Sequence, residues 1–435
     1  MANTLRIALA GLGTVGAGVI RLLGENGDLI AQRAGRPIEI TAVSARDRAK
    51  DRGVDIGGFA WEDDMTALAA RDDVDVVVEL VGGSDGPAVA LARTALRAGK
   101  GLVTANKAMV AHHGLELAEL AEAHGAPMRY EAAVAGGIPA IKGIGEGAAA
   151  NRIERIYGIL NGTCNYILSE MESSGRDFGD VLGEAQALGY AEADPTFDIE
   201  GVDAAHKLSL LASLAFGTRL DFASVATTGI SRIRAADIAQ ARALGYVIRL
   251  IGLADCEVSE GERHLFQRVA PYLVPTSHPL AGVGGPTNAV VAEGNFSGRL
   301  LFEGAGAGDG PTASAVVADL IDIARGNVLP PFSLPVSALE ASAPADPGHR
   351  RNRAYLRFLV ADRPGVLAEI TAAMRDADVS IESMIQQGHP DDDENPVLVS
   401  MVTHEGPEGS VDQALAMLEG SASLADKPLV MRLLG

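Results

Sequence analysis

The pattern of hydrophobic and polar residues divides the first 130 residues into alternating strands and helices. Continuous apolar runs, which are typical of strands buried on both faces, occur at residues 5–10, 38–44, 74–80 and 101–105. Stretches rich in Ala, Leu and Glu predict helices near residues 15–23, 64–70, 87–98 and 114–124. This alternation predicts an α/β dinucleotide-binding domain at residues 1–130, with a parallel sheet between two layers of helices.

The pattern changes after residue 130, and it predicts an α+β domain over residues 131–310. Strand-like stretches occur at residues 152–160 and 245–254, and helical stretches at residues 165–173, 179–188 and 201–215. Residues 311–330 are expected to return to the first domain. Residues 334–352 are rich in Ala, Pro and Ser, which predicts a linker.

A third module is predicted at residues 353–435. Strands and helices alternate there as strand, helix, strand, strand, helix and strand, at residues 354–360, 366–376, 379–387, 396–403, 410–418 and 428–434. This is a βαββαβ arrangement of the ferredoxin-like type. The acidic run at residues 391–395 falls between the two middle strands, and we expect a solvated loop without chemistry.

The length, charge and cysteine content of the chain exclude several classes of protein. The 435 residues predict two or three domains, and the formal net charge of −21 argues against a nucleic-acid partner, because phosphate contacts need clustered Lys and Arg. The two cysteines are too few for a disulfide framework or a zinc cluster, and Cys164 is predicted to be a buried small residue. There is no run of about 18 apolar residues and no signal peptide, so we expect a cytoplasmic protein without membrane contact.

A glycine-rich turn follows the first predicted strand. Gly11, Gly13 and Gly16 form a GxGxxG motif at a helix start, where backbone N–H groups can approach a pyrophosphate. An ordinary tight turn is the alternative, but the position between strand and helix favours a Rossmann-like cofactor site. Arg46 ends the second strand and could pair with a 2′-phosphate, which favours NADP, while the adjacent Asp47 keeps NAD open.

Three further segments can contribute to this site. Thr104 and Lys107 lie at the carboxyl end of a predicted parallel strand, the sheet edge where ligands bind, and a surface lysine is the alternative for Lys107. Residues 131–139 form an apolar Gly-rich turn with one carboxylate, which suits either a hard cation or a hinge between domains. A second Gly-rich turn precedes a predicted helix, and its Gly306 and Gly308 either close over the cofactor or only permit close packing.

The acidic segment at residues 192–208 is the strongest chemical signal. It gathers one lysine, Lys207, and five carboxylates, Glu192, Asp194, Asp198, Glu200 and Asp203. An exposed pair of Asp203 and Lys207 at i,i+4 would contribute only about 0.3–0.5 kcal/mol. The apolar stretch at residues 208–216 must be buried, however, so we expect the pair at the mouth of a core. There Lys207 can give a proton to a carbonyl oxygen, and the carboxylates can receive a substrate ammonium. His206 lies on another helix face and is predicted to be packed or exposed rather than catalytic.

Seven motifs occur in an order that resembles the homoserine dehydrogenase family: GLGTVG, VVELVGG, TANKAM, EAAVAGGIP, GILNGTCNYIL, GYAEADPTFDIEGVDAAHKL and GAGAGDGPTASAV. The resemblance covers about residues 5–326 and is most specific at residues 189–207. It implies an oxidoreductase that reversibly interconverts L-aspartate 4-semialdehyde and L-homoserine with NAD(P), on the route to threonine, methionine and isoleucine.

The resemblance also implies roles for individual residues. Catalytic roles fall on Lys207 as proton donor, with Asp203 and Lys107. Substrate-binding roles fall on Gly189, Glu192, Asp198 and Asp203. Cofactor contacts fall on the first loop, including Leu12, Thr14 and Val15, and on Lys107. A sodium site is implied at Glu131 and at the main-chain carbonyls of Val134, Gly136 and Ile138.

The third module is similar to an ACT domain, a small regulatory fold, on the strength of ADRPGVLAEIT at residues 361–371. Pro364 and Gly365 shape a helix start whose N–H groups can take an amino-acid carboxylate. The family implies threonine as the allosteric effector, and a domain that only mediates assembly is the alternative. We expect a homodimer or homotetramer, because the family dimerises through its second domain and ACT domains pair edge strands. The rival functions are another amino-acid-directed Rossmann oxidoreductase and a non-catalytic nucleotide or amino-acid sensor.

Overall fold

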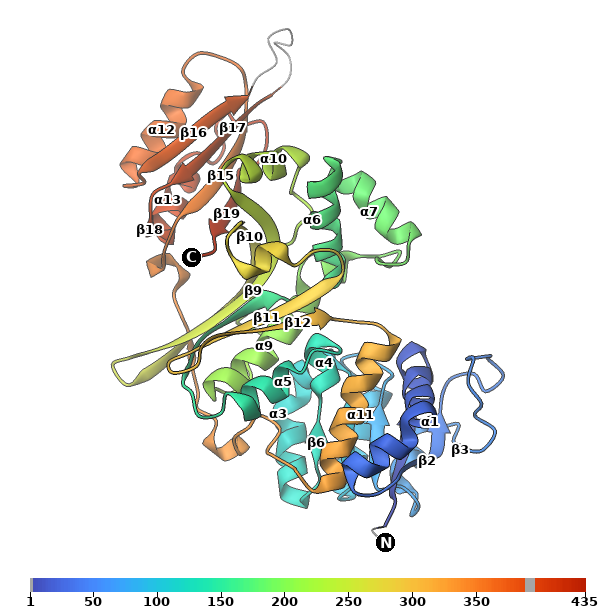
Figure 1. Cartoon of the computed structure of the whole chain (residues 1–435). Helices are drawn as coiled ribbons and strands as arrows, with labels where there is room; N and C mark the ends of the chain where they lie inside the picture. The colour runs from blue at the N-terminus through green and yellow to red at the C-terminus, as the bar shows by residue number, and fades with distance from the viewer. Residues whose placement is uncertain (1–2, 388–395) are drawn as a thin grey trace.

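The computed structural model describes residues 3–387 and 396–435. Figure 1 shows a dinucleotide-binding unit at one end, a central sheet, and a C-terminal unit at the other end. The predicted α/β fold class is confirmed. The acidic run at residues 391–395, expected to be a solvated loop, lies outside the described residues. None of the described helices is long and apolar enough to cross a membrane.

The first unit is a parallel sheet of six strands in the order β3-β2-β1-β4-β5-β6. The strands are β1 (Leu5–Ala10), β2 (Ile38–Ser44), β3 (Ala60–Trp61), β4 (Val76–Glu79), β5 (Gly101–Thr104) and β6 (Met128–Arg129). The helices that cover it are α1 (Thr14–Ala34), α2 (Pro87–Arg97), α3 (Lys107–His124) and α11 (Asp309–Arg325). α11 comes from far along the chain and packs against α1. The strand order reverses between β1 and β4, which places a ligand cleft at the carboxyl ends of those strands.

Several helix boundaries differ from the expectation. The helix expected near residues 64–70 is a 3₁₀ turn at Met65–Ala70. α3 begins at Lys107 rather than near residue 114, because the Asn106 side chain accepts a hydrogen bond from Met109 N at 3.0 Å and caps the helix. The segment expected to be only a Gly-rich turn begins with a short helix, α4 (Glu131–Ala135), and turns at Gly136 with φ +57°.

The central sheet is mainly antiparallel and continues into the C-terminal unit, in the order β12-β11-β7-β9-β10-β19-β15-β17-β16. Its longer strands before the C-terminal unit are β7 (Ile153–Ile159), β9 (Tyr246–Ser259), β10 (Glu262–Pro275), β11 (Thr287–Gly294) and β12 (Gly298–Ala305). The helices beside it are α6 (Gly162–Ser174), α7 (Phe178–Ala187), α9 (Val202–Phe216) and α10 (Ala235–Ala243). The strands β10, β11 and β12 were not among the predicted elements.

Helix α9 lies between the dinucleotide-binding unit and the central sheet. Every residue of α9 except Val202 and Ala215 is buried, because α3 and α4 pack on one side and β7, β9 and β10 on the other. The apolar stretch at residues 208–216 therefore forms part of the core, as its sequence predicted. The first turn of α9, with Asp203 and Lys207, is held at the boundary between the two units.

The C-terminal unit has the predicted βαββαβ order. Its elements are β15 (Ala354–Val360), α12 (Val366–Asp376), β16 (Ile381–Gln387), β17 (Val397–Thr403), α13 (Glu408–Met417) and β19 (Leu429–Leu433). β19 pairs with β15 and also, in parallel, with β10, which joins this unit to the central sheet. Shorter elements are α5 (Ala140–Lys142), α8 (Thr196–Ile199), β8 (Ala226–Thr227), β13 (Ala343–Pro344), β14 (Arg351–Asn352) and β18 (Gly406–Pro407). β13 lies within the expected linker and pairs with β10.

Candidate active site

A cavity of about 1090 Å³ lies where the two larger units meet. One part is lined by Val15 at the start of α1, by residues after β4 and β5, and by the turn between β12 and α11. The other part is lined by the start of α6, by the acidic segment and by the first turn of α9. The cavity thus joins the sheet edge that favours a nucleotide to the segment that concentrates carboxylates.

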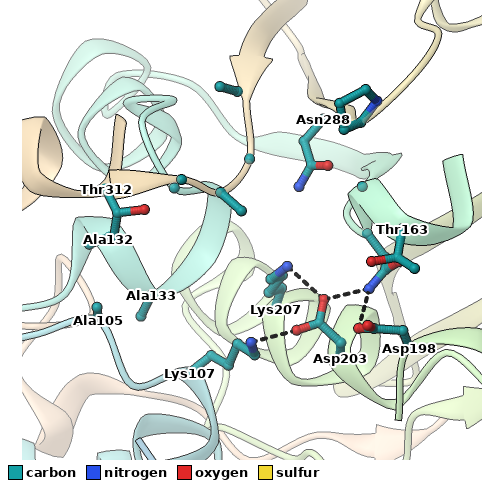
Figure 2. Close-up of a pocket in the computed structure, with 18 of the residues that line it drawn as sticks. Ala105, Lys107, Ala132, Ala133, Thr163, Asp198, Asp203, Lys207, Asn288 and Thr312 are labelled. Carbon is teal, nitrogen blue, oxygen red and sulfur yellow. Dashed lines mark hydrogen bonds and ion pairs between the residues drawn. The ribbon is translucent and has the colours of Figure 1, made fainter. Parts of the chain in front are cut away.

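Asp203 is the centre of the site. Its side chain is buried, and its two carboxylate oxygens are each paired with a different lysine (Figure 2). Lys107 Nζ lies 2.7 Å from Oδ1, and Lys207 Nζ lies 2.6 Å from Oδ2. Burial alone would raise the pKa of Asp203, but the two ammonium groups hold it well below its usual range. The pair of Asp203 and Lys207 is therefore a buried ion pair, not the exposed pair that was the weaker alternative.

Lys207 is fixed by two acceptors. Besides Asp203, its ammonium donates to the carbonyl oxygen of Leu160 at 2.7 Å, and that same oxygen accepts a hydrogen bond from Asn288 Nδ2 at 3.1 Å. An ammonium has three N–H donors, so one is left for a ligand in the cavity. Burial lowers the pKa of Lys207, which makes its proton easier to transfer.

Asn161 was missed as a site residue. Its Nδ2 donates to Asp198 Oδ1 at 2.8 Å and to Asp203 Oδ2 at 3.0 Å, while its Oδ1 accepts from Cys164 N at 2.8 Å and caps α6. The sequence signal was an asparagine directly before a helix start in GILNGTCNYIL. That signal predicts a cap but not the contact with residues that are distant in sequence.

The carboxylates of the acidic segment do not act as one group. Asp198 lies beside Asp203, whereas Glu192 and Asp194 line the outer, exposed part of the cavity, with Gly189 next to them. Burial and the neighbouring Asp203 raise the pKa of Asp198. Glu200 does not line the cavity. The segment thus offers an inner pair and an outer pair of carboxylates to a cationic group.

The predicted cofactor residues divide into those that line the cavity and those that shape the loops around it. The lining residues are Val15, Lys107, Gly306 and Gly308. Gly11 has φ +99°, and a Cβ atom at Gly16 would lie 2.2 Å from the Gly11 carbonyl oxygen, so both glycines are required by the turn itself. Leu12, Gly13 and Thr14 belong to the same turn and lie outside the lining.

Two of the predicted cofactor contacts lie outside the cavity lining. Thr104 is fully buried outside the cavity lining, and its hydroxyl donates to Glu79 Oε2 at 2.6 Å. Arg46 is exposed at the end of β2, also outside the lining. Arg52, which sequence reasoning missed, donates to the Leu12 carbonyl at 3.1 Å and brings a guanidinium to the first cofactor loop.

Gly306 is needed for a close contact. A Cβ atom at this position would lie 2.1 Å from Asn288 Nδ2, so any larger residue would displace the amide that shares the Leu160 carbonyl with Lys207. The close-packing interpretation of this glycine-rich turn is therefore supported. The cofactor interpretation is compatible with it, because Gly306 also lines the cavity.

The expected cation site is built around Glu131. Its buried carboxylate accepts hydrogen bonds from Ile141 N and Lys142 N, both at 2.9 Å, and burial followed by the charge of Asp319 raises its pKa to about 7. Within residues 3–387 and 396–435, no three His, Cys, Asp or Glu side chains are placed to hold a metal ion. A cation here would rely on one carboxylate and main-chain carbonyls, which are all oxygen donors of the type that a hard cation takes.

His206 is packed, as expected. It is buried, stacks on Phe222 with ring centroids 4.3 Å apart, and lies 3.3 Å from His112 between their Nε2 atoms. Burial lowers the pKa of His206 to about 4, so it is neutral near pH 7. Cys164 is also buried, and its thiol has a raised pKa because of that burial. Neither residue is suited to acid–base or nucleophilic chemistry.

Three family models match the chain: "Homoserine dehydrogenase, NAD binding domain" at residues 11–131, "Homoserine dehydrogenase" at residues 139–321, and "ACT domain" at residues 354–420. The homoserine dehydrogenase of Pseudomonas aeruginosa is 45% identical over 95% of both chains. That of Corynebacterium glutamicum is 44% identical over 99% of this chain and 96% of its own.

Solved structures agree with these matches. The crystal structure of a homoserine dehydrogenase from Thiobacillus denitrificans has a TM-score of 0.91 at 42% identity and covers 99% of this chain and 98% of its own. A hyperthermophilic archaeal homoserine dehydrogenase in complex with NADPH is similar in fold, with a TM-score of 0.61 at 24% identity over 74% of this chain and 97% of its own.

Proposed function

The chain belongs to the homoserine dehydrogenase family, and from this membership and the geometry of the cavity we propose how its residues interconvert L-aspartate 4-semialdehyde and L-homoserine. The observation that carries the proposal is Asp203, a buried carboxylate held between the ammonium groups of Lys107 and Lys207 beside the open cavity. When bound, NADPH supplies the hydride that reduces the aldehyde carbon.

Lys207 is the proton donor in this proposal. Its third N–H is directed by the two bonds to Asp203 and Leu160, and it can hydrogen-bond the aldehyde oxygen and give it a proton as negative charge develops. Asp203 keeps the ammonium in place. Lys107, on the opposite oxygen of Asp203, follows β5 and also lines the cavity, so it is placed to contact cofactor and substrate.

The substrate ammonium is assigned to the acidic segment. Glu192 and Asp198 offer carboxylates on the same side of the cavity as Asp203, and Gly189 allows the turn beside them with φ +77°. A cationic ligand there would offset the like charges of Asp198 and Asp203. This arrangement favours an amino-acid aldehyde over a neutral aldehyde as substrate.

The cofactor is assigned to the turn at residues 11–16, with Leu12, Thr14 and Val15, and to Lys107, Gly306 and Gly308. Thr104 is left out of this assignment, because it is fully buried outside the cavity lining. The NAD-binding family model supports a nicotinamide dinucleotide. We assign NADP rather than NAD on the exposed Arg46 at the end of β2, which leaves a guanidinium free for a 2′-phosphate.

A sodium ion is assigned to Glu131 and to the main-chain carbonyls of Val134, Gly136 and Ile138. The raised pKa of Glu131 supports this assignment, because a buried carboxylate without a cationic partner is costly to ionise. The ion would hold this segment together between the two units, and no step of the reaction passes through it.

The proposal also covers the domain organisation, the regulation and the assembly of the enzyme. We assign residues 1–130 with 311–330 to the cofactor domain, residues 131–310 to the substrate and dimerisation domain, residues 334–352 to a linker, and residues 353–435 to the regulatory ACT domain. Threonine, bound by the ACT domain, would inhibit the enzyme as an end product of the pathway to threonine, methionine and isoleucine. The assembly would be a cytoplasmic homodimer or homotetramer.

One assay tests the reaction and its rivals. Purified enzyme should oxidise NADPH with L-aspartate 4-semialdehyde, faster than it oxidises NADH, and more slowly when threonine is added. Oxidation only with a different amino-acid or imine substrate would favour another oxidoreductase. Binding of NADPH without any turnover would favour a sensor.

A further inference from the structure

We propose that Asn161 is a positioning residue of this reaction: it divides its two amide hydrogens between Asp198 and Asp203 and thereby holds Asp203 in the orientation that presents Lys207 to the substrate. The inference rests on the proposed function of Lys207. It concerns a side chain whose amide donates to the two carboxylates and that acts on Lys207 through them.

Every polar atom of the Asn161 side chain is used. Nδ2 donates to Asp198 Oδ1 and Asp203 Oδ2, and Oδ1 accepts from Cys164 N. The orientation of the amide is fixed by chemistry, because the carboxylates require N–H donors and the backbone N–H requires an oxygen. The residue is buried, so water does not substitute for any of these three bonds in the folded protein.

Asn161 lies between two like-charged carboxylates and offsets their mutual repulsion. Asp198 and Asp203 come from α8 and α9, carry the same charge, and share Nδ2 of Asn161 as a common donor. A neutral donor between them stabilises both charged forms without adding a third charge. The other charged groups around the pair are Lys107 from α3 and Lys207 from α9, with Glu192 at the outer rim.

Loss of Asn161 should affect Lys207 more than Lys107, because Asn161 and Lys207 donate to the same oxygen of Asp203. Asp203 Oδ2 accepts from both Asn161 Nδ2 and Lys207 Nζ, whereas Oδ1 is paired with Lys107. Without Asn161, only the two lysines would orient the carboxylate, and Oδ2 would lose the one neutral donor that fixes it relative to Lys207. The direction of the third N–H of Lys207 would then be less well defined. Misplacement of a catalytic group by about 1 Å can cost two orders of magnitude in rate.

Asn161→Ser tests the positioning role of Asn161 while keeping a residue that can cap α6. Serine caps a helix about as well as asparagine, so α6 should keep its start, while both hydrogen bonds to the carboxylates are lost. We expect kcat/KM for L-aspartate 4-semialdehyde to fall at least about tenfold, with NADPH affinity within about twofold of wild type. The acidic limb of the pH profile should move to higher pH, because Asp198, whose pKa is already raised by burial, loses a donor hydrogen bond.

Asn161→Asp sharpens the same test. Aspartate also caps the helix but places a third carboxylate beside Asp198 and Asp203, so we expect a larger loss of kcat/KM per folded molecule than in the serine variant. This buried carboxylate should also lower stability, so activity is compared per folded molecule. A purely structural role would leave kcat/KM per folded molecule near wild type in both variants.

Asn165 provides the matched control. It is a buried asparagine one turn later on α6, and its Nδ2 donates to the carbonyls of Val283, Gly285 and Thr287 instead of to carboxylates. Asn165→Ala should lower the unfolding temperature and leave the pH profile unchanged.

The outcomes are distinguishable. The inference is overturned if Asn161→Ser keeps the wild-type kcat/KM and pH profile, or if it loses activity only in proportion to the unfolded fraction. Equal losses of NADPH affinity and activity would also overturn it, since they indicate general damage. A wild-type enzyme that never reduces the semialdehyde would instead refute the proposed function itself.

Discussion

Two buried aspartates in this molecule each form a short ion pair with a basic side chain, but only one of them lies at a cavity. Asp203 lies 2.6 Å from Lys207 at the cavity, and Asp237 in α10 lies 2.7 Å from Arg357 in β15, where the central and C-terminal units meet. Both ion pairs are almost fully buried. Burial of an ion pair therefore does not by itself identify a functional site.

The difference lies in the remaining hydrogen-bonding capacity. Asp237 accepts additional bonds from Tyr355 Oη at 3.0 Å and from Arg234 N at 2.9 Å, and neither Asp237 nor Arg357 is exposed to solvent. Lys207, in contrast, retains an N–H toward open space. The Asp203 cluster lines an open cavity, whereas the Asp237 cluster is enclosed by protein.

The largest expected effect follows from removing the proton donor. Lys207→Met should lower kcat for semialdehyde reduction by about 10²–10⁴-fold, because no other described ammonium can take the same place on Leu160 and Asp203. Asp203 keeps Lys107 as a partner, so the fold and the NADPH affinity should remain close to wild type. Steady-state kinetics and cofactor titration measure this, and a variant with wild-type turnover would refute the assignment of Lys207.

Replacing the basic residue of the Asp237 cluster should instead lower stability and leave activity nearly unchanged. Arg357→Met leaves Asp237 buried without its cationic partner, which should lower the free energy of unfolding by about 3–5 kcal/mol. Activity per folded molecule should remain near wild type, because the cluster does not contact the cavity. Urea unfolding followed by kinetics at low denaturant separates the two effects. A large loss of kcat with unchanged stability would show that the contrast between the clusters is wrong.

A smaller effect distinguishes Lys207 from Arg357, the cation of the other cluster, by its dependence on pH. Above the pKa of Lys207, kcat/KM for semialdehyde reduction should fall about tenfold per pH unit. Burial lowers the pKa of Lys207, whereas arginine stays protonated throughout the assay range. Semialdehyde reduction needs protonated Lys207, so its kcat/KM should fall as pH rises through that pKa, and homoserine oxidation should rise. His206→Gln is the control: His206 has its pKa lowered to about 4, mainly by burial, so this variant should not move the alkaline limb.

The contrast also shows what the sequence could predict. Asp203 and Lys207 are one helical turn apart, and the apolar stretch after them indicated their burial, so local pattern was sufficient. The contact of Lys107 with Asp203 and that of Asn161 with Asp203 join segments far apart in the chain, and spacing carries no information about such meetings. The position of Lys107 at the edge of the predicted sheet left a surface lysine open as the alternative, and the resemblance to a family implied its catalytic role, but neither predicted its contact with Asp203.

Strands were missed for a related physical reason. β12 at the edge of the central sheet alternates exposed and partly buried residues and contains two glycines, so it lacks the continuous apolar run that marked β1 or β4. Its position depends on pairing with β11, over the register Thr287 to Ala305 through Gly294 to Gly298. A half-exposed strand of this type is defined by its partner more than by its own composition.

The smallest expected effect concerns Glu131, a third buried acid with yet another setting. Its carboxylate is held by two backbone N–H groups instead of an ammonium, which leaves its charge uncompensated by a direct partner and suits a sodium ion. Replacing choline chloride with sodium chloride at constant ionic strength should raise the free energy of unfolding by about 1 kcal/mol when sodium is several times its dissociation constant. Glu131→Gln should abolish the difference between the salts, while Asp322→Asn, which removes a neighbour of Lys142, should preserve it. Equal thermal stability of the wild type in both salts would place Glu131 with Asp237 as a structural acid, and would leave Asp203 as the one buried carboxylate of the three that serves a ligand.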